Sequence, residues 1–179
     1  MKPTLIVAAS ILSTLASGLV LPDLSCRSTT VTRPEIAILV NEDHPLPTWP
    51  VRIAEASRWR GAHTTRVLLG FFVPACTGTC TISFSDSIVA IGTRRLQLFT
   101  TLGYPTCGNT WTTRPPLNIH KGTFLAPNGA GPATVLEDFG LTFPCPATTT
   151  KLGFDVSPVG DNDYVIWDIA KGGFIITCG

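Results

Sequence analysis

The chain has 179 residues, a formal net charge of +1, and charged residues at only 14% of its positions. It contains no run of Lys and Arg, so nucleic acid and anionic membrane surfaces are not expected partners, because both bind clustered basic side chains. The length is enough for one domain with a proper hydrophobic core and too short for two.

The N-terminal segment has the features of a secretory signal peptide. Lys2 gives a positive start, residues 5–21 carry no charge, and the apolar run ends among small residues that include Ala16 and Gly18. A basic start, an apolar stretch and a small-x-small exit are the three parts of such a signal. We therefore expect residues 1–18 to be removed, so that the mature chain begins near Leu19 and is secreted to the extracellular space.

A membrane anchor is the competing interpretation of the same segment. The apolar run is about as long as a minimal span, but hydroxyl residues dilute it and no Lys or Arg follows it closely. Residues 19–33 are expected to form a poorly packed lead-in, and residues 34–179 the folded domain. No segment after the lead-in is long and apolar enough to span a bilayer.

Short apolar runs, punctuated by Gly and Pro, follow one another through the rest of the chain. Some alternate apolar with polar residues and others are uniformly apolar, as expected for strands with one or two covered faces. They predict about eight strands, at residues 35–40, 66–73, 79–85, 95–98, 141–143, 151–156, 164–169 and 174–178. Only residues 53–60 resemble a helix, and that segment is short. The pattern predicts an all-β fold: a single disulfide-stapled β-sandwich, jelly-roll-like or immunoglobulin-like, with little helix.

The alternation also predicts which side chains point into the core. Residues on the apolar phase of each strand form the inward set, because a shift by one residue would expose them. This set is Ile82, Phe84, Leu96, Leu98, Phe143, Leu152, Phe154, Val156, Ile166 and Ile176. Ser83 and Asp155 occupy the opposite phase and are expected to face solvent.

Six cysteines follow the predicted signal peptide: Cys26, Cys76, Cys80, Cys107, Cys145 and Cys178. An even number in an oxidising compartment predicts a disulfide framework in which all six pair. Cys26 with Cys178 would tie the two ends together, and Cys76 with Cys80 would close a tight loop, but the connectivity stays open. Zinc is the alternative, since Cys76 and Cys80 have a tolerable ligand spacing, yet no second close Cys or His pair completes four ligands. No metal or other cofactor is therefore expected.

Several short motifs occur in an order that resembles a known family. The first half contains Phe-Val-Pro at 72–74, Cys-Thr-Ile-Ser-Phe at 80–84 and Thr-Trp-Thr-Thr-Arg-Pro at 110–115. The second half contains Phe-Pro-Cys-Pro at 143–146, Asp-Tyr-Val-Ile-Trp-Asp at 163–168 and Gly-Phe-Ile-Ile at 173–176. Over residues 36–178 the chain resembles the C-terminal domain family of the fungal ubiquitin-three binding protein, the But-two C-terminal domain.

This resemblance implies a secreted or surface fungal protein with a compact β-sandwich and no established activity. It does not imply ubiquitin binding, because ubiquitin-like modifiers work in the cytosol and nucleus and the signal peptide directs this chain elsewhere. It also transfers no catalytic or ligand residue. Cys76 and the Ala147-Thr148 turn depart from the family pattern, which affects the disulfide pattern and loop shape more than the fold.

No enzyme motif is recognisable, so the chain is not expected to be an enzyme. The G-x-S-x-G elbow of α/β hydrolases is absent. His44, His63 and His120 lie in predicted loops with no partner at the spacing of a triad or a metal pair. His44 beside Glu42 and Asp43 comes nearest to a metal cluster, but a solvated loop before a proline explains it as well. The predicted mature end at Leu19 disfavours a copper site at an N-terminal His.

Glycosidases commonly use two facing carboxylates, so the acidic groupings are the remaining catalytic candidates. They are Glu137-Asp138 and the set Asp161, Asp163 and Asp168. The Asp-Asn-Asp sequence at 161–163 is typical of a turn in which such side chains bond their own backbone.

Aromatic residues offer a further kind of site. Trp49, Trp59 and Trp111 lie in loop-like contexts, whereas Trp167 lies in a predicted strand. Exposed rings can stack on sugar faces, but rings can equally cap the ends of a sandwich core. Trp111 and Arg114 are the first candidates for a surface patch.

Three functional classes remain from the sequence. The first is a secreted non-catalytic β-sandwich protein that acts at the cell surface or extracellularly, on cell-wall polysaccharide or on an extracellular protein. The second is a carbohydrate-binding module of the same fold, and the third is a glycoside hydrolase-like enzyme.

Overall fold

The computed structural model describes residues 29–179, and both the predicted signal peptide and Cys26 lie outside this range. Within the described residues every helix or strand element is a β-strand. The predicted all-β fold is therefore confirmed. No helix in this range is long and apolar enough to cross a membrane.

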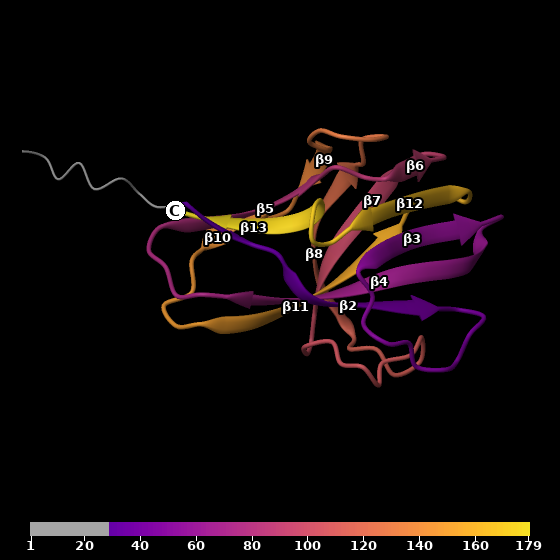
Figure 1. Ribbon diagram of the computed structural model, residues 1–179, viewed down its shortest axis with the longest axis horizontal. Coiled ribbons are helices and arrows are strands. Elements are labelled where there is room, and N and C mark those ends of the chain that lie inside the picture. The colour runs from indigo at the N-terminus through magenta and orange to yellow at the C-terminus, as the bar shows by residue number, and fades with distance from the viewer. Residues whose placement is uncertain (1–28) are drawn as a thin grey trace, which may run out of the picture.

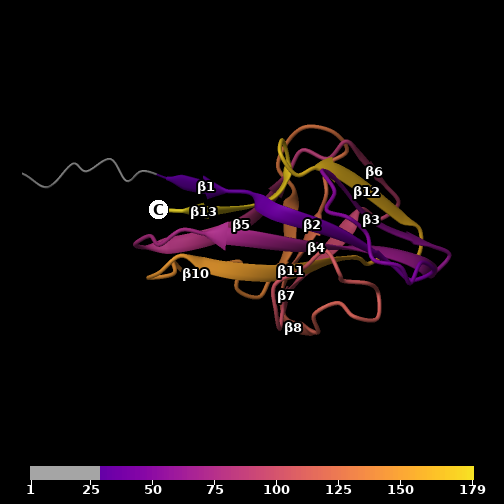
Figure 2. The same cartoon turned by 60° about the horizontal axis from the view of Figure 1, so that its bottom comes forward.

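The strands form two antiparallel sheets in a sandwich-like arrangement. The smaller sheet has the order β1-β13-β5-β10, with bounds Thr30–Thr32, Gly173–Cys178, Thr79–Ser85 and Thr142–Pro144. The larger has the order β6-β12-β3-β4-β11-β7-β8-β9, with bounds Val89–Ile91, Asp163–Asp168, Ile53–Trp59, Ala62–Val73, Thr150–Pro158, Arg95–Thr101, Leu117–Leu125 and Thr134–Asp138. Strand β2, Pro34–Asn41, also pairs with β4. The smaller sheet extends toward the C-terminus, whereas β3, β6 and β12 lie at the opposite end (Figures 1 and 2).

The core lies where the two sheets meet, around a group of four buried aromatic rings. Phe84 and Phe174 come from the smaller sheet, and Trp167 and Phe124 from the larger one. The ring centroids of Phe84 and Phe174 are 4.8 Å apart, and those of Phe84 and Trp167 are 5.4 Å apart, both in edge-to-face geometry. Such pairs add about 0.5–1.5 kcal/mol each beyond the burial of their area. Gly173, with φ of +79°, is required beside them, because a Cβ there would overlap the indole of Trp167.

Most of the predicted inward set lies in this core. The buried members are Ile82, Phe84, Leu96, Leu98, Phe154, Val156 and Ile176, and Phe143 and Leu152 are partly buried against them. The prediction for β12 is wrong by one residue. Val165 and Trp167 point inward and are fully buried, whereas Ile166 points outward. The run is apolar on both phases, so its pattern could not fix the phase.

The helix-like segment at 53–60 forms strand β3. It joins β4 through Arg60 and Gly61, whose φ angles are +52° and +74°. Two successive positive φ values are characteristic of a type I′ turn, which matches the twist of the paired strands and favours Gly. The hairpin places Trp59 at the end of a strand rather than in a loop.

A second apolar cluster covers the outer face of β2, β4 and β11. Ile38, Val40 and Leu68 are buried there, and Trp111, from the loop between β7 and β8, packs against them. Asp155 points to the same outer face as its neighbour Leu68 and is completely buried. The expectation that Asp155 faces solvent is therefore wrong. Its phase was predicted correctly, but the loop that covers this face was not.

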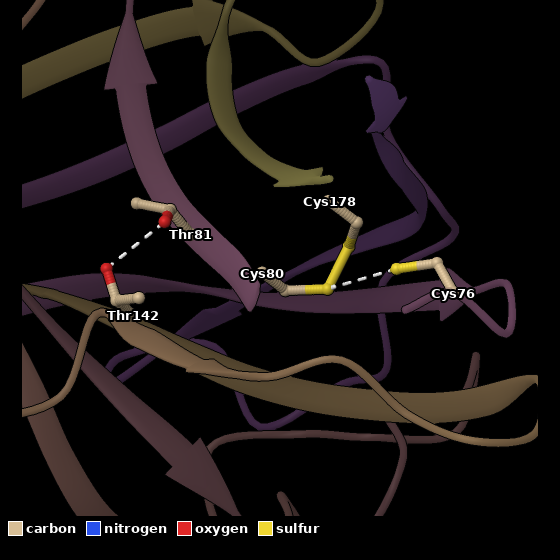
Figure 3. The surroundings of a disulfide bond; sticks show 5 residues. All are labelled: Cys76, Cys80, Thr81, Thr142 and Cys178. Carbon is tan, nitrogen blue, oxygen red and sulfur yellow. Dashed lines mark hydrogen bonds between the residues drawn. A yellow bond between two sulfur atoms is a disulfide. The ribbon is translucent and has the colours of Figure 1, made fainter. Parts of the chain in front are cut away.

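One disulfide is formed among the described residues, between Cys80 and Cys178. These residues lie directly opposite each other on β5 and β13, with Cα atoms 4.1 Å apart. The suggested pairings of Cys26 with Cys178 and of Cys76 with Cys80 are therefore wrong, because the strand register commits Cys80 and Cys178 to each other. Figure 3 shows Cys76 beside this bridge, with its Sγ 3.8 Å from that of Cys80.

Candidate functional site

An exposed group of aromatic and apolar side chains lies on the outer face of strands β3, β12 and β6. Tyr164 is paired with Ser57 on one side and with Ile91 on the other, and paired residues of neighbouring strands share a face. Trp59 follows Ser57 by two residues and therefore points the same way. We call the set Glu55, Ser57, Trp59, Ile91 and Tyr164 the aromatic face. Trp59 is 59% exposed, Ile91 59% and Tyr164 39%.

Two turns at the edge of this face, beside Trp59 and Tyr164, are joined by hydrogen bonds from backbone amides. The amide of Arg60 donates to the side-chain oxygen of Asn162 at 3.0 Å, and the amide of Gly61 donates to the carbonyl of Asp161 at 3.0 Å. These bonds tie the β3–β4 turn to the turn before β12. They hold the backbone next to Trp59 and Tyr164, so the strand ends that carry the two rings keep a fixed relation.

The rings border a partly open hollow of about 350 Å³, whose lining is mainly apolar with a few polar groups. Ser57 donates to one carboxylate oxygen of Glu55 at 2.7 Å, which orients a group with further acceptor capacity. Arg58 and Asn162 line the same hollow. The guanidinium of Arg60 lies 5.6 Å from the centre of the Trp59 ring and adds donors at the rim. Apolar rings together with a few oriented polar groups are the usual composition of a small-molecule site.

A second hollow, of about 310 Å³, lies where β10, β11 and β7 approach one another. A lysine ammonium lies near each of two aromatic rings that line it. The ammonium of Lys151 lies 5.1 Å from the centre of Tyr104, and that of Lys121 lies 5.8 Å from the centre of Phe143. Tyr104 also donates its hydroxyl to Glu35 at 3.1 Å, and burial raises its pKa to about 12. Trp59 also has a cation near its ring, but Tyr104 and Phe143 are partly buried whereas Trp59 is exposed, so this hollow offers less free ring surface than the aromatic face.

The predicted patch residues Trp111 and Arg114 lie together, but they form a half-buried lid. The guanidinium of Arg114 lies 4.2 Å from the centre of the Trp111 ring, and that of Arg66 lies 5.4 Å from it. Both cations sit over Asp155, and the ring packs on the second apolar cluster. Trp111 thus covers this cluster on the outer face of the sheet, rather than an end of the sandwich core.

Asp155 has an unusual electrostatic environment. Its carboxylate lies 3.6 Å from Nη1 of Arg66 and 3.7 Å from Nε of Arg114, and neither oxygen has a hydrogen-bond partner among the described residues. Burial raises the pKa of Asp155 above its ordinary value of 3.8, although the two guanidinium groups act in the opposite direction. Burial likewise lowers the pKa of Arg114. The group is enclosed by the lid, so we assign it to the covering of the outer face.

The histidines lie apart from the aromatic face. His63 lies in β4 rather than in the predicted loop, with its exposed ring 2.9 Å from a carboxylate oxygen of Asp43. Glu42, which precedes Asp43 in the chain, accepts from the amide of Thr64, and this bond lowers the pKa of the Glu42 carboxyl group. His120 stacks on Phe99 with ring centroids 4.6 Å apart.

Three of the five acidic residues named as catalytic candidates bind backbone amides, whereas Glu137 accepts from the hydroxyl of Thr123. Asp163 accepts from the amides of Thr93, Arg94 and Gly160. Asp138 accepts from two amides that follow it, and these bonds lower its pKa. The bidentate bond from Arg52 and the amide of Ala170 lower the pKa of Asp168. These carboxylates stabilise turns, as the turn chemistry of 161–163 indicated.

Sequence reasoning named Trp59 but missed Tyr164 and Glu55. Tyr164 occupies the outward phase of β12, and the misassigned phase of that strand hid it. Glu55 was hidden because residues 53–60 were compared with a helix rather than with a strand. Period-two alternation of 53–59 would have placed Glu55, Ser57 and Trp59 on one face.

The chain matches no protein-family model, and no curated protein matches its sequence.

Proposed function

We propose that this chain is an extracellular, non-catalytic β-sandwich domain that binds carbohydrate on the aromatic face. The observation that carries the proposal is the pairing of exposed Trp59 and Tyr164 around a hollow bordered by Glu55 and Asn162. The axial C–H groups of a pyranose form an apolar surface that packs on an aromatic ring, while its hydroxyl groups bind carboxylate, amide and guanidinium groups.

Three further features support this assignment. Charged groups of both signs border the hollow, with Glu55 and Asp163 against Arg58 and the rim guanidinium of Arg60, which suits a neutral polyhydroxylated ligand better than a charged one. Its strands are held by continuous pairing and by the two tied turns, so little order has to be gained on binding. Three of the five acidic residues considered as hydrolase candidates, Asp138, Asp163 and Asp168, are engaged by backbone amides.

The extracellular location is supported by the predicted signal peptide and is compatible with the disulfide between Cys80 and Cys178. The resemblance to the But-two C-terminal domain family stays a prediction, and it agrees with a role at a fungal surface. The location and the ligand class are independent parts of the proposal.

Retention on insoluble polysaccharide tests the ligand class. The purified chain without residues 1–18 would be mixed with chitin, cellulose or β-glucan particles, and the protein left in solution would be measured. We expect depletion by at least one polymer and release by the matching soluble oligosaccharide. No depletion by any of the three, in a chain shown to be folded, would contradict the proposal.

A further inference from the structure

A group of four sulfur atoms lies away from the aromatic face and plays no part in the proposed function. One Sγ from each of Cys76, Cys80, Cys145 and Cys178 lies within 4.8 Å of all the others. We call these residues the sulfur cluster. Cys80 and Cys178 are bonded to each other, and Cys76 and Cys145 are free cysteines.

The backbone brings the two thiols together independently of the bridge. Strands β5 and β10 pair up to Thr79 and Pro144, and two backbone hydrogen bonds extend this contact. The amide of Cys145 donates to the carbonyl of Gly78 at 3.1 Å, and the amide of Cys76 donates to the carbonyl of Pro146 at 3.2 Å. Cys76 and Cys145 are thus close neighbours on paired segments, where disulfide geometry is readily reached.

We propose that Cys76 and Cys145 form a second disulfide, which lies against the bridge between Cys80 and Cys178. Each thiol gives up its proton, the two sulfur atoms lose two electrons together and an S–S bond forms. The electrons pass to a small-molecule or protein disulfide, whose own S–S bond breaks and which leaves as two thiols. The two residues are only half-buried and border an open hollow of about 520 Å³, so such an oxidant can reach them.

The alternative occupant of four cysteines is zinc, which requires four thiolate ligands. The bond between Cys80 and Cys178 removes two of these four ligands. Cys76 and Cys145 alone supply two thiolates, fewer than the four that a structural zinc site requires. A disulfide between them is uncharged and needs no ionised group in the folded state.

The second bridge would also protect the first. The Sγ of Cys76 lies 3.8 Å from that of Cys80, so a reduced Cys76 is placed to attack the existing disulfide by thiol exchange (Figure 3). Once Cys76 is bonded to Cys145, this attacking group is gone. We therefore expect the two bridges to resist mild reduction together.

Peptide mapping of the secreted chain tests the proposal. Free thiols would be alkylated in acid-quenched, denatured protein without reduction, and tryptic peptides would be analysed by mass spectrometry. Trypsin leaves Cys76 and Cys80 on one peptide, so three peptides should remain joined. Fragmentation between residues 76 and 80 should then show Cys76 linked to Cys145 and Cys80 linked to Cys178.

The count of alkylated thiols within the cluster gives a second readout. The wild-type chain should have none, and Cys145→Ser should have one. Cys107→Ser serves as the control, because Cys107 is an exposed cysteine outside the cluster and its loss should leave the count at none. Two alkylated thiols in the wild type, crossed linkages, or one bound zinc per chain by elemental analysis would each overturn the proposal.

Discussion

Asp155 is completely buried with its carboxylate 3.6 Å from the guanidinium of Arg66. Because burial raises the pKa of Asp155, the folded state holds its proton more tightly than the unfolded state does. The stability linked to this proton is fully present below pH 3.8 and is lost as the pH rises through the higher pKa of the folded state.

The Asp155→Asn variant should therefore gain stability relative to the wild type as the pH rises from about 4 to about 7. Urea unfolding of both chains at several pH values measures this difference. Asp168→Asn is the matched control with the opposite sign, since Arg52 lowers the pKa of Asp168 and its contribution is lost as the pH falls. Parallel pH curves for wild type and Asp155→Asn would contradict this assignment.

The register of β5 predicts a sharp difference between two adjacent positions. Phe84 packs against Phe174 and Trp167, so Phe84→Ala should lower the free energy of unfolding by about 3–5 kcal/mol. Ser83→Ala, on the outward phase of the same strand, should cost less than about 0.5 kcal/mol. Equal sensitivity of the two sites in urea unfolding would mean that the strand register is wrong.

The bridge between Cys80 and Cys178 closes a loop with a sequence separation of 98 residues. Replacing both cysteines by Ala should cost about 2–5 kcal/mol, because the unfolded chain regains the freedom that the bridge removes. Cys107→Ala, at an exposed position, should change the free energy of unfolding by less than about 0.5 kcal/mol. A double variant as stable as the wild type would show that the bridge does not constrain the chain.

Processing of the N-terminus is a separate prediction. N-terminal sequencing of secreted material should begin at or close to Leu19, because Ala16 and Gly18 meet the small-residue rule for cleavage. An intact Met1 on a membrane-bound product would support the anchor interpretation instead.

The sequence predicted the fold class because apolar and polar residues alternate strongly in strands such as β5 and β11. Phe84 and Phe154 each lie on the apolar phase of their own strand. It did not predict the burial of Asp155, which depends on a loop that folds back over the outer face of its strand. Long-range coverage of this kind leaves no local period in the sequence. The same limit applies to the sulfur cluster, where the pairing of β5 with β13 and β10, not spacing along the chain, brings four cysteines together.

The candidate site was predictable only in part for a related reason. Trp59 could be named from its residue type, but its partner Tyr164 is distant in the chain and was hidden by an apolar run with two equivalent phases. Pairing of β3 with β12 creates the site, and a single sequence does not contain that pairing.

The most direct test of the central claim compares two exposed tryptophans on the polysaccharide that retains the wild-type chain. Trp59→Ala should weaken binding by at least about tenfold, equivalent to about 1.4 kcal/mol. Trp49→Ala is the control, because Trp49 is 82% exposed and lies in a loop outside the aromatic face. The account predicts loss of affinity for Trp59→Ala alone, with both variants as stable as the wild type. Unchanged affinity of Trp59→Ala, or an equal loss in Trp49→Ala, would contradict it.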